Sequence, residues 1–351
     1  MNPSSEFWSG RRVFLTGHTG FKGAWLSLWL TRLGAVVTGY ALPPEGDRNL
    51  FDLARIGRRS VSVLGDIRDV GNLSRAVADA RPEIVFHLAA QALVWRGYDD
   101  PSATFEVNTI GTVNLLEALR RAPSVRAAVI VTSDKVYDNR EWPWAYREID
   151  RLGGRDPYGA SKAAAEIAVD ALRVLQSTSV ATARAGNVIG GGDWAEDRLV
   201  PDCIRALMKG SSPHLRQPGS TRPWQHALDA LSGYLILAER LIEDGQAVSE
   251  AWNFGPPADG LAEVVEVAAR VSELWGGPAP VAAAATASGR EARSLLLDAG
   301  KARARLGWRP RLMLAEALTW TVEWYRRQHE GSDALDLSLD QIARYEALAV
   351  R

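Results

Sequence analysis

The sequence predicts an α/β fold in which a doubly wound parallel sheet is joined to a smaller, mixed α/β C-terminal lobe. Three observations lead to this prediction. Short apolar runs alternate with amphipathic stretches, these runs contain few polar positions, and the alternation stops after residue 186. Nearly continuous apolar strands are typical of parallel sheets covered by helices on both faces, and β–α alternation is typical of a doubly wound sheet.

Six strands form the first part of the chain. The runs RRVFLTG, AVVTGY, SVSVLGD, EIVFHLAA, AAVIVTS and SVATARAG predict strands at residues 11–17, 35–40, 60–66, 83–90, 127–133 and 179–186. Helical patterns lie between them, the clearest at residues 20–33, 101–121 and 157–176. We therefore predict one domain over residues 1–186, with its sheet completed from about residues 226–256.

The second part of the chain has mixed patterns. Helices are predicted near residues 226–242, 261–275 and 311–329, and a short strand at AWNFGP. We predict that residues 187–225 and 257–330 form the smaller lobe. Residues 331–351 are predicted to form a helical tail, which could cover another subunit.

Composition excludes several classes of protein. The formal net charge of −1 offers no basic surface for nucleic acid or an anionic membrane. Cys203 is the single cysteine, which excludes internal disulfides and fits a reducing cytoplasm. The five histidines lack ligand spacing, so we predict no metal site. No targeting segment opens the chain, and no apolar run approaches the ~20 residues that span a bilayer. We expect a cytoplasmic protein.

A glycine-rich turn follows the first strand, in VFLTGHTGFKG. Gly17 permits a tight turn, Gly20 lets the backbone approach a pyrophosphate, and Gly23 permits close packing of helix on strand. The helix N-terminus offers N–H groups and partial positive charge to the phosphates. Residues 1–186 are therefore predicted to be a Rossmann-type dinucleotide-binding domain. The predicted cofactor contacts of the turn are Gly17, Thr19, Gly20, Phe21, Lys22 and Gly23.

The choice between NAD and NADP is open in the sequence. The acid expected after the second strand is missing, and Glu45 or Asp47 can replace it only if the loop folds back. Lys22 and Arg48 are possible partners of a 2′-phosphate. We predict NAD, with NADP not excluded. The remaining predicted cofactor contacts follow the third and fourth strands and are Asp66, Ile67, Leu88, Ala89 and Ala90.

Tyr158 and Lys162 are four residues apart, so they share one face of a predicted helix. This helix follows the strand that ends in Ser133, at the sheet edge where ligands of such folds bind. A free phenol titrates near ~10, and neighbouring positive charge lowers that pKa. We predict that Tyr158 removes a proton from a sugar hydroxyl held by Ser133, while Lys162 binds the nicotinamide ribose.

Several motifs together resemble the extended short-chain dehydrogenase/reductase family, namely TGHTGFKG, HLAAQ, NTIGT, TSDKVY and PYGASK. Three longer segments resemble, within that family, the 4,6-dehydratases of CDP-glucose: TSDKVYDNREWPWAYREIDRLGGRDPYGASK, RAGNVIGGGDWAEDRLVPD and RPWQHALDALSGYLILA. The likeness runs from about Phe7 to Trp324. These long motifs are far more specific than the glycine turn.

The resemblance implies a lyase that binds NAD throughout a three-stage reaction. Sugar C4 is oxidised to a ketone, water is lost across C5 and C6, and hydride returns to C6. Tyr158 would be the base at the 4-hydroxyl, with Ser133 orienting it. Asp134 would protonate the departing 6-hydroxyl, and Lys135 would assist proton removal at C5, where TDP-glucose dehydratases have a glutamate. Adjacent residues face opposite ways on a regular strand, so both reach the sugar only if the strand ends there.

The resemblance also implies a CDP-hexose as substrate and a homodimer or dimer of dimers as the assembly. Helices 101–121 and 157–176 commonly pair across the dimer in this family. The implied substrate contacts are Gln91, Asn187, Arg222 and Asn253. The guanidinium of Arg222 suits a diphosphate because its donors match two oxygens at once.

One segment departs from the family pattern. After HLAAQ the chain reads ALVWRGY, with Trp95 where an arginine is common. Sugar or nucleotide preference could therefore differ. An NDP-sugar 4-epimerase would retain Tyr158 and Lys162 but needs no acid beside Ser133. A catalytically silent cofactor-binding module is the third alternative, and the intact set of Ser133, Tyr158 and Lys162 argues against it.

Overall fold

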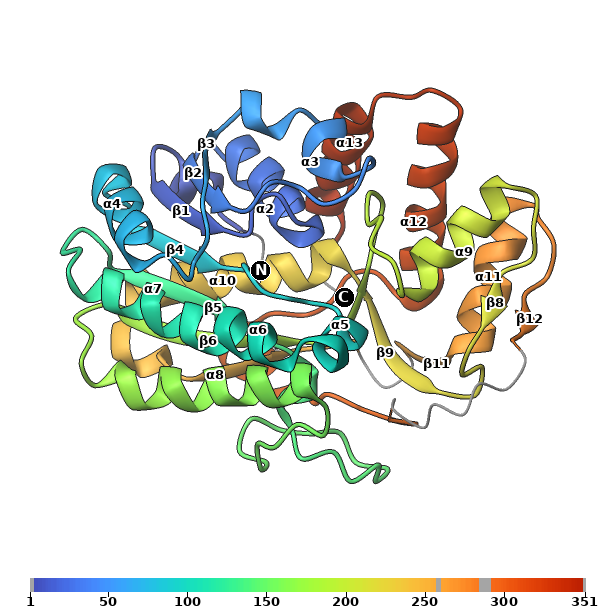
Figure 1. Cartoon of the computed structure of the whole chain (residues 1–351). Coiled ribbons are helices and arrows are strands. Elements are labelled where there is room, and N and C mark those ends of the chain that lie inside the picture. The colour runs from blue at the N-terminus through green and yellow to red at the C-terminus, as the bar shows by residue number, and fades with distance from the viewer. Residues whose placement is uncertain (1–2, 257–259, 284–291, 350–351) are drawn as a thin grey trace.

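The computed structural model describes residues 3–256, 260–283 and 292–349 of the chain. Its main layer is a seven-stranded parallel sheet with the order β10-β6-β5-β4-β1-β2-β3 (Figure 1). The strands are β1 (Arg12–Thr16), β2 (Val36–Ala41), β3 (Val61–Leu64), β4 (Ile84–His87), β5 (Ala127–Val131), β6 (Ser179–Ala185) and β10 (Ala251–Phe254). The predicted α/β fold with a doubly wound parallel sheet is confirmed. The strand order reverses between β1 and β4, and such a reversal opens a crevice at the carboxyl edge.

Helices cover both faces of this sheet, which explains the apolar strands. Val13 and Leu15 of β1 belong to a core on one face, and Phe14 belongs to a second core on the other. Because successive side chains of a strand alternate between faces, both sets must be apolar. The first core includes α2 (Phe21–Arg32) and α10 (Ala227–Asp244), and the second includes α4 (Val70–Ala80), α7 (Gly111–Arg120) and α8 (Pro157–Arg173).

The helix predicted over residues 101–121 is divided by a wide turn. It consists of α6 (Pro101–Phe105), a π-helical turn at Glu106–Ile110, and α7. The turn buries Asn108, whose amide nitrogen donates to the Gln91 carbonyl (3.0 Å) and to Ser161 Oγ (2.9 Å). Wide turns of this kind are frequent at functional sites. Here the turn joins the loop after β4 to helix α8.

The smaller lobe contains two short sheets beside the main one. One pairs β7 (Asn187–Ile189), β9 (Thr221–His226) and β11 (Leu261–Glu263), and the other pairs β8 (His214–Leu215) with β12 (Val281–Ala282). Helices α9 (Leu199–Met208) and α11 (Val264–Trp275) pack beside them. Most of these elements have two or three residues per strand, too few for a pattern in the sequence. The proposed division into domains stays a prediction, and its ranges include residues outside those described.

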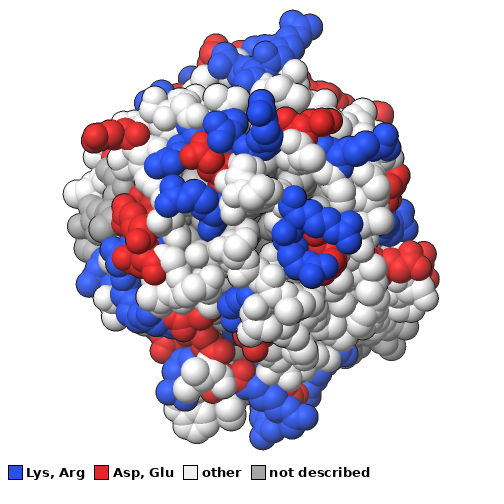
Figure 2. Space-filling view, turned by 90° about the vertical axis from the view of Figure 1, so that its left-hand side faces the viewer, with Lys and Arg blue, Asp and Glu red and all other residues white. Residues whose placement is uncertain are grey.

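Apart from the two C-terminal helices, the remaining elements are short. They are α1 (Ser5–Trp8), α3 (Leu50–Leu53), α5 (Val94–Asp99) and single turns at Ile56–Arg58, Asp134–Val136, Gly245–Val248 and Ala302–Leu306. None of the described helices has the length and apolarity that a bilayer-spanning segment requires. On the face shown in Figure 2, basic and acidic side chains are interspersed, and neither sign forms a continuous field.

The C-terminal helices belong to the core of their own chain. Helix α12 (Leu314–His329) leads to α13 (Ala334–Ala347), which packs against α2. Tyr345 is fully buried and its hydroxyl donates to Asp229 of α10 (2.7 Å). Trp29 of α2 donates to Glu346 (3.0 Å). The apolar face of the tail is thus buried within its own chain, and the expectation that the tail also covers another subunit stays a prediction.

Candidate active site

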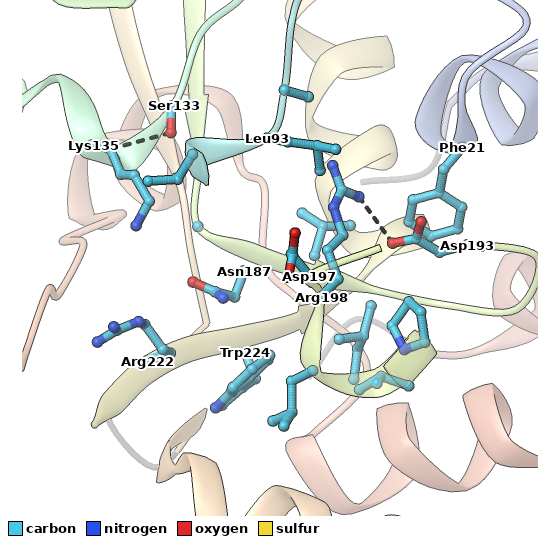
Figure 3. Close-up of a pocket in the computed structure, with 18 of the residues that line it drawn as sticks. Phe21, Leu93, Ser133, Lys135, Asn187, Asp193, Asp197, Arg198, Arg222 and Trp224 are labelled. Atoms are coloured by element: carbon cyan, nitrogen blue, oxygen red, sulfur yellow. Dashed lines mark hydrogen bonds and ion pairs between the residues drawn. The ribbon is translucent and has the colours of Figure 1, made fainter. Parts of the chain in front are cut away.

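A pocket of about 280 Å³ opens at the carboxyl edge of the main sheet, between β5 and the smaller lobe (Figure 3). Its walls come from the end of β5, from the starts of α2 and α8, and from β7, β9 and α9. Of the predicted site residues, the following line it: Phe21, Lys22, Ser133, Asp134, Lys135, Tyr158, Asn187 and Arg222. Residues more than 200 positions apart in the sequence thus meet around one cavity.

The end of β5 presents three polar side chains to this pocket. Regular strand geometry ends at Val131, and a 3-10 turn begins at Asp134. The turn releases Asp134 and Lys135 from strand alternation, so both can line the same cavity. Both side chains were expected to reach the same sugar only if the strand ends before them, and the structure meets this condition.

Asp134 is a buried residue in the wall of this pocket. The residue is 3% exposed, and its Oδ1 accepts a hydrogen bond from Ser133 Oγ (3.0 Å). Its Oδ2 is buried and has no hydrogen-bond partner among the described residues. A buried polar atom without a partner is costly and often marks a functional site. The carboxyl group faces the cavity that Tyr158 also lines, and not bulk solvent.

Tyr158 and Lys162 lie in the first turns of α8, which Asp156 caps by accepting from the Gly159 N–H (2.9 Å). Both are buried, at 9% and 4% exposure. Burial raises the pKa of Tyr158 to about 12, although a hydrogen bond with Ser133 lowers it. Burial, followed by the charge of Lys22, lowers the pKa of Lys162 to about 7. In the protein alone, the pKa of the phenol is therefore shifted opposite to the expected direction, because desolvation exceeds the effect of neighbouring positive charge.

Cationic side chains surround the remaining wall of the pocket. Arg198 forms an ion pair with Asp193 (2.9 Å), visible in Figure 3. Arg222 is 5% exposed and donates to the Thr221 carbonyl (3.0 Å). Burial and the charge of Arg198 lower the pKa of Lys22 to about 8. Among these cations, the guanidinium of Arg222 has the donor geometry that suits a diphosphate.

The sequence reasoning did not select Asp193 and Arg198 as site residues. In the sequence alone, Arg198 is equally suited to a charged surface. The signal that could have found them is the acid and base five residues apart in DWAEDR, within one of the long motifs.

The glycine turn has the shape that a pyrophosphate requires. Gly17 has φ +75°, and a Cβ there would lie 2.6 Å from the Ala89 nitrogen. A Cβ on Gly23 would lie 2.0 Å from the Gly17 carbonyl oxygen. No side chain caps the N-terminus of α2 at Gly20, so its first N–H groups remain available. The residues present therefore fit a dinucleotide.

The predicted contacts of the adenosine end lie at neighbouring strand ends. Leu88, Ala89 and Ala90 follow β4, directly beside Gly17. Asp66 follows β3 and forms an ion pair with Arg68 (2.6 Å), whose hydrogen bonds lower the pKa of the carboxyl. Thr19 donates to the Leu42 carbonyl (2.9 Å), and Ile67 packs in the second core. Their roles in binding stay predictions.

Three of the side chains that could set the choice between NAD and NADP contact different parts of the protein. Glu45 forms an ion pair with Arg96 (2.8 Å). Lys22 lines the catalytic pocket, where the charges of Asp134 and Asp193 act on it. The guanidinium of Arg48 lies over the Trp194 ring, 5.3 Å from its centroid. Lys22 thus lies at the catalytic end of the site.

Gln91, Lys162 and Asn253 are predicted site residues that do not line the pocket. The Gln91 amide donates to Thr104 (2.9 Å), and Lys162 Nζ donates to the Val131 carbonyl (3.2 Å). Gln91 therefore stabilises a neighbouring side chain, and Lys162 stabilises the backbone at the end of β5.

Asn253 of β10 has a structural role in this arrangement. It is fully buried, and its amide donates to the carbonyls of Tyr146 (2.9 Å) and Asp298 (3.1 Å). Its Oδ1 accepts from the Tyr137 hydroxyl (2.7 Å). With these three contacts the side chain is satisfied by the protein itself, so the geometry favours a structural role over the predicted substrate contact.

Replacing Asn253 by alanine is expected to lower the free energy of unfolding by about 3 kcal/mol while leaving KM for the nucleotide sugar unchanged. The reason is that buried partners lose their hydrogen bonds, each costing about 1–3 kcal/mol. Urea unfolding and steady-state kinetics measure the two quantities. Asn187→Ala is the control, expected to raise KM with little loss of stability. A raised KM in the Asn253 variant would restore it as a substrate contact.

Comparisons with known proteins agree with this geometry. The family model described as GDP-mannose 4,6 dehydratase matches residues 14–321. The CDP-glucose 4,6-dehydratase of Salmonella typhimurium is 45% identical over 99% of both chains. The UDP-glucose 4-epimerase of Mycolicibacterium smegmatis is 29% identical and covers 91% of this chain and 100% of its own.

Solved structures show the same architecture. The dTDP-glucose 4,6-dehydratase DesIV of Streptomyces venezuelae, with NAD and TYD bound, has a TM-score of 0.79 and 26% identity, covering 92% of this chain and 99% of its own. The UDP-glucose 4-epimerase of Thermus thermophilus, in complex with NAD, has a TM-score of 0.80 and 27% identity, covering 90% and 99%.

Proposed function

Because the chain belongs to the GDP-mannose 4,6-dehydratase family, within the extended short-chain dehydrogenases/reductases, we propose that it is an NAD-dependent nucleotide-sugar 4,6-dehydratase, a lyase. CDP-D-glucose is the substrate and CDP-4-keto-6-deoxy-D-glucose the product. The observation that carries the proposal is the buried carboxyl of Asp134, bonded to Ser133 and sharing one cavity with Tyr158. An epimerase has no use for an acid there.

NAD is the cofactor, supported by the fit of the glycine turn and by NAD in the related structures. The turn at Gly17–Gly23 and the N-terminus of α2 would hold its pyrophosphate. When bound, the nicotinamide would supply, in its oxidised form, a hydride acceptor for C4 and a positive charge, and, in its reduced form, a hydride donor for C6.

The first stage requires a base at the 4-hydroxyl. Tyr158 removes the hydroxyl proton as the C4 hydride departs, and Ser133 orients the same hydroxyl. The ammonium of Lys162, held by the Val131 carbonyl, favours the phenolate. The 4-ketone formed in this way acidifies the proton on C5.

The elimination requires a base and an acid at the end of β5. Lys135 removes the C5 proton, and Asp134 donates a proton to the 6-hydroxyl, which leaves as water. Lys135 returns a proton to C5 when the double bond is reduced at C6. Arg222 and Asn187 bind the diphosphate throughout, while the cationic wall keeps it in place.

The assembly is a homodimer or a dimer of dimers. Large apolar side chains are exposed on α6, on the π-helical turn and on α8, among them Phe105, Ile110 and Ile167. These elements lie side by side, and exposed apolar side chains are typical of surfaces that bind another protein. Sedimentation equilibrium of the protein measures its oligomeric state.

The decisive experiment is incubation of the purified protein and NAD with a panel of CDP-, TDP-, GDP- and UDP-hexoses. A 4,6-dehydratase forms an alkali-absorbing 4-keto-6-deoxy sugar, and CDP-glucose is expected to give the highest kcat/KM. An epimerase forms no such product. Conversion of a hexose into its C4 epimer alone would replace the proposal.

A further inference from the structure

Glu166 lies on the same face of α8 as Tyr158 and Lys162, four residues beyond the lysine. It is 4% exposed, and its two oxygens accept four hydrogen bonds. The donors are Thr132 Oγ1 (2.5 Å), Thr182 Oγ1 (2.7 Å) and two nitrogens of Arg184 (2.9 and 2.8 Å). Its carboxylate is therefore fully occupied, and neither Glu166 nor Arg184 lines the pocket.

Arg184 lies on β6 and connects Glu166 to the residue that follows the 3-10 turn at Asp134–Val136. Its third nitrogen donates to the Tyr137 hydroxyl (2.8 Å). That hydroxyl donates in turn to Asn253. A planar guanidinium can hold a carboxylate with one edge and a hydroxyl with the other.

Glu166 and Arg184 each bind one end of the same short segment. Thr132, held by Glu166, directly precedes Ser133, and Tyr137, held by Arg184, follows the 3-10 turn. Between these two anchors lie Ser133, Asp134 and Lys135. The helix that supplies Tyr158 is thus joined to the segment that supplies the elimination groups.

We propose that Glu166 and Arg184 are positioning residues, which fix segment 132–137 relative to α8 so that the redox and elimination groups face the same hexose. The inference rests on the proposed function, since it concerns the two stages of that reaction. A misplacement of catalytic groups by about 1 Å can cost about 100-fold in rate. Neither residue contacts the sugar, so their replacement should lower kcat and leave KM unchanged.

Glu166 also acts on the charge of Lys162. Burial and Lys22 of α2 lower the pKa of this lysine, and the negative charge of Glu166 raises it. His87 of β4 also interacts with Lys162 and itself has its pKa lowered to about 3, first by burial, so it stays neutral. Loss of the Glu166 charge therefore lowers the pKa of Lys162.

The experiment compares Glu166→Gln, Arg184→Met and the double variant with the wild-type protein, using NAD and CDP-glucose. Each single variant is expected to lower kcat about 10- to 100-fold with KM within about twofold. The alkaline limb of the kcat profile, where Lys162 loses its proton, should move to lower pH in Glu166→Gln. The double variant leaves no unpaired buried charge, so it remains folded, and because it also lacks the Glu166 charge its limb should move to lower pH as well.

Glu239→Gln is the matched control. Glu239 is a buried carboxylate outside the pocket that accepts from Trp8 Nε1 (2.6 Å) and the Ser4 N–H (2.8 Å). Its replacement should lower the unfolding temperature without changing kcat or the pH profile. The same result in the Glu166 and Arg184 variants would overturn the proposal.

A structural readout separates this inference from the proposed function. If the wild-type protein forms no keto sugar, the proposed function fails. Crystal structures of the wild-type protein and the double variant still test the inference. Displacement of segment 132–137 relative to Tyr158 supports the positioning role, and an unmoved segment overturns it.

Discussion

Tyr158→Phe is expected to lower the rate of the first hydride transfer about 10³-fold, because general base catalysis contributes about 10²–10⁴-fold to such steps. Phenylalanine retains the ring that fills the buried site but has no oxygen to accept the proton of the 4-hydroxyl. The later stages need the 4-ketone, so the whole reaction stops with the first. Mixing the variant with NAD and CDP-glucose in a stopped-flow instrument measures the appearance of reduced nicotinamide directly.

Tyr234→Phe is the control for this experiment. Tyr234 is fully buried on α10, its hydroxyl has no hydrogen-bond partner among the described residues, and its ring lies 5.9 Å from the Lys22 nitrogen. Loss of that hydroxyl should leave the rate near that of the wild-type protein. A Tyr158 variant that oxidises CDP-glucose within about tenfold of the wild-type rate would remove the phenol from the mechanism.

Asp134→Asn is expected to allow oxidation at C4 but to slow the loss of water about 100-fold. The amide retains the shape of the side chain and can still accept from Ser133, but it has no proton of suitable acidity for the leaving hydroxyl. Oxidation then exceeds elimination in rate, so reduced nicotinamide accumulates in the first turnover and decays slowly. Absorbance of the reduced cofactor, followed together with formation of the keto sugar, measures both steps.

Asp202→Asn provides the comparison within the same pocket. Asp202 lies on α9 and pairs with Arg205, away from the end of β5. Its replacement should cause no accumulation of reduced cofactor. If the Asp134 variant shows the same steady state as the wild-type protein, the acid of the elimination must be sought elsewhere.

The parts of the site that could be predicted from the sequence are those formed by one strand, one turn and one helix. The glycine turn after β1, the polar end of β5 and the first turns of α8 each lie within a short segment, so spacing alone places their side chains. The carboxyl edge of a parallel sheet then brings these segments together.

The parts that the sequence did not indicate depend on contacts between distant segments. Asn253 is saturated by Tyr146, Asp298 and Tyr137, which lie on other elements. The pKa of Tyr158 depends on how deeply the phenol is buried, and no spacing in the sequence reports burial at a single position. The wide turn at Asn108 could not be predicted for the same reason, because its hydrogen-bond partners, Gln91 and Ser161, lie on other segments.

The place of α13 has a consequence for the order in which the protein folds. Trp29 and Glu346, joined by a hydrogen bond, are 317 residues apart in sequence. Contacts of such separation form late, because a long loop must be closed before they can stabilise anything. During synthesis, helix α2 must therefore wait for a surface that is translated 317 residues after Trp29. Until that surface has emerged, the nascent nucleotide-binding region lacks the cover that α13 gives to this tryptophan.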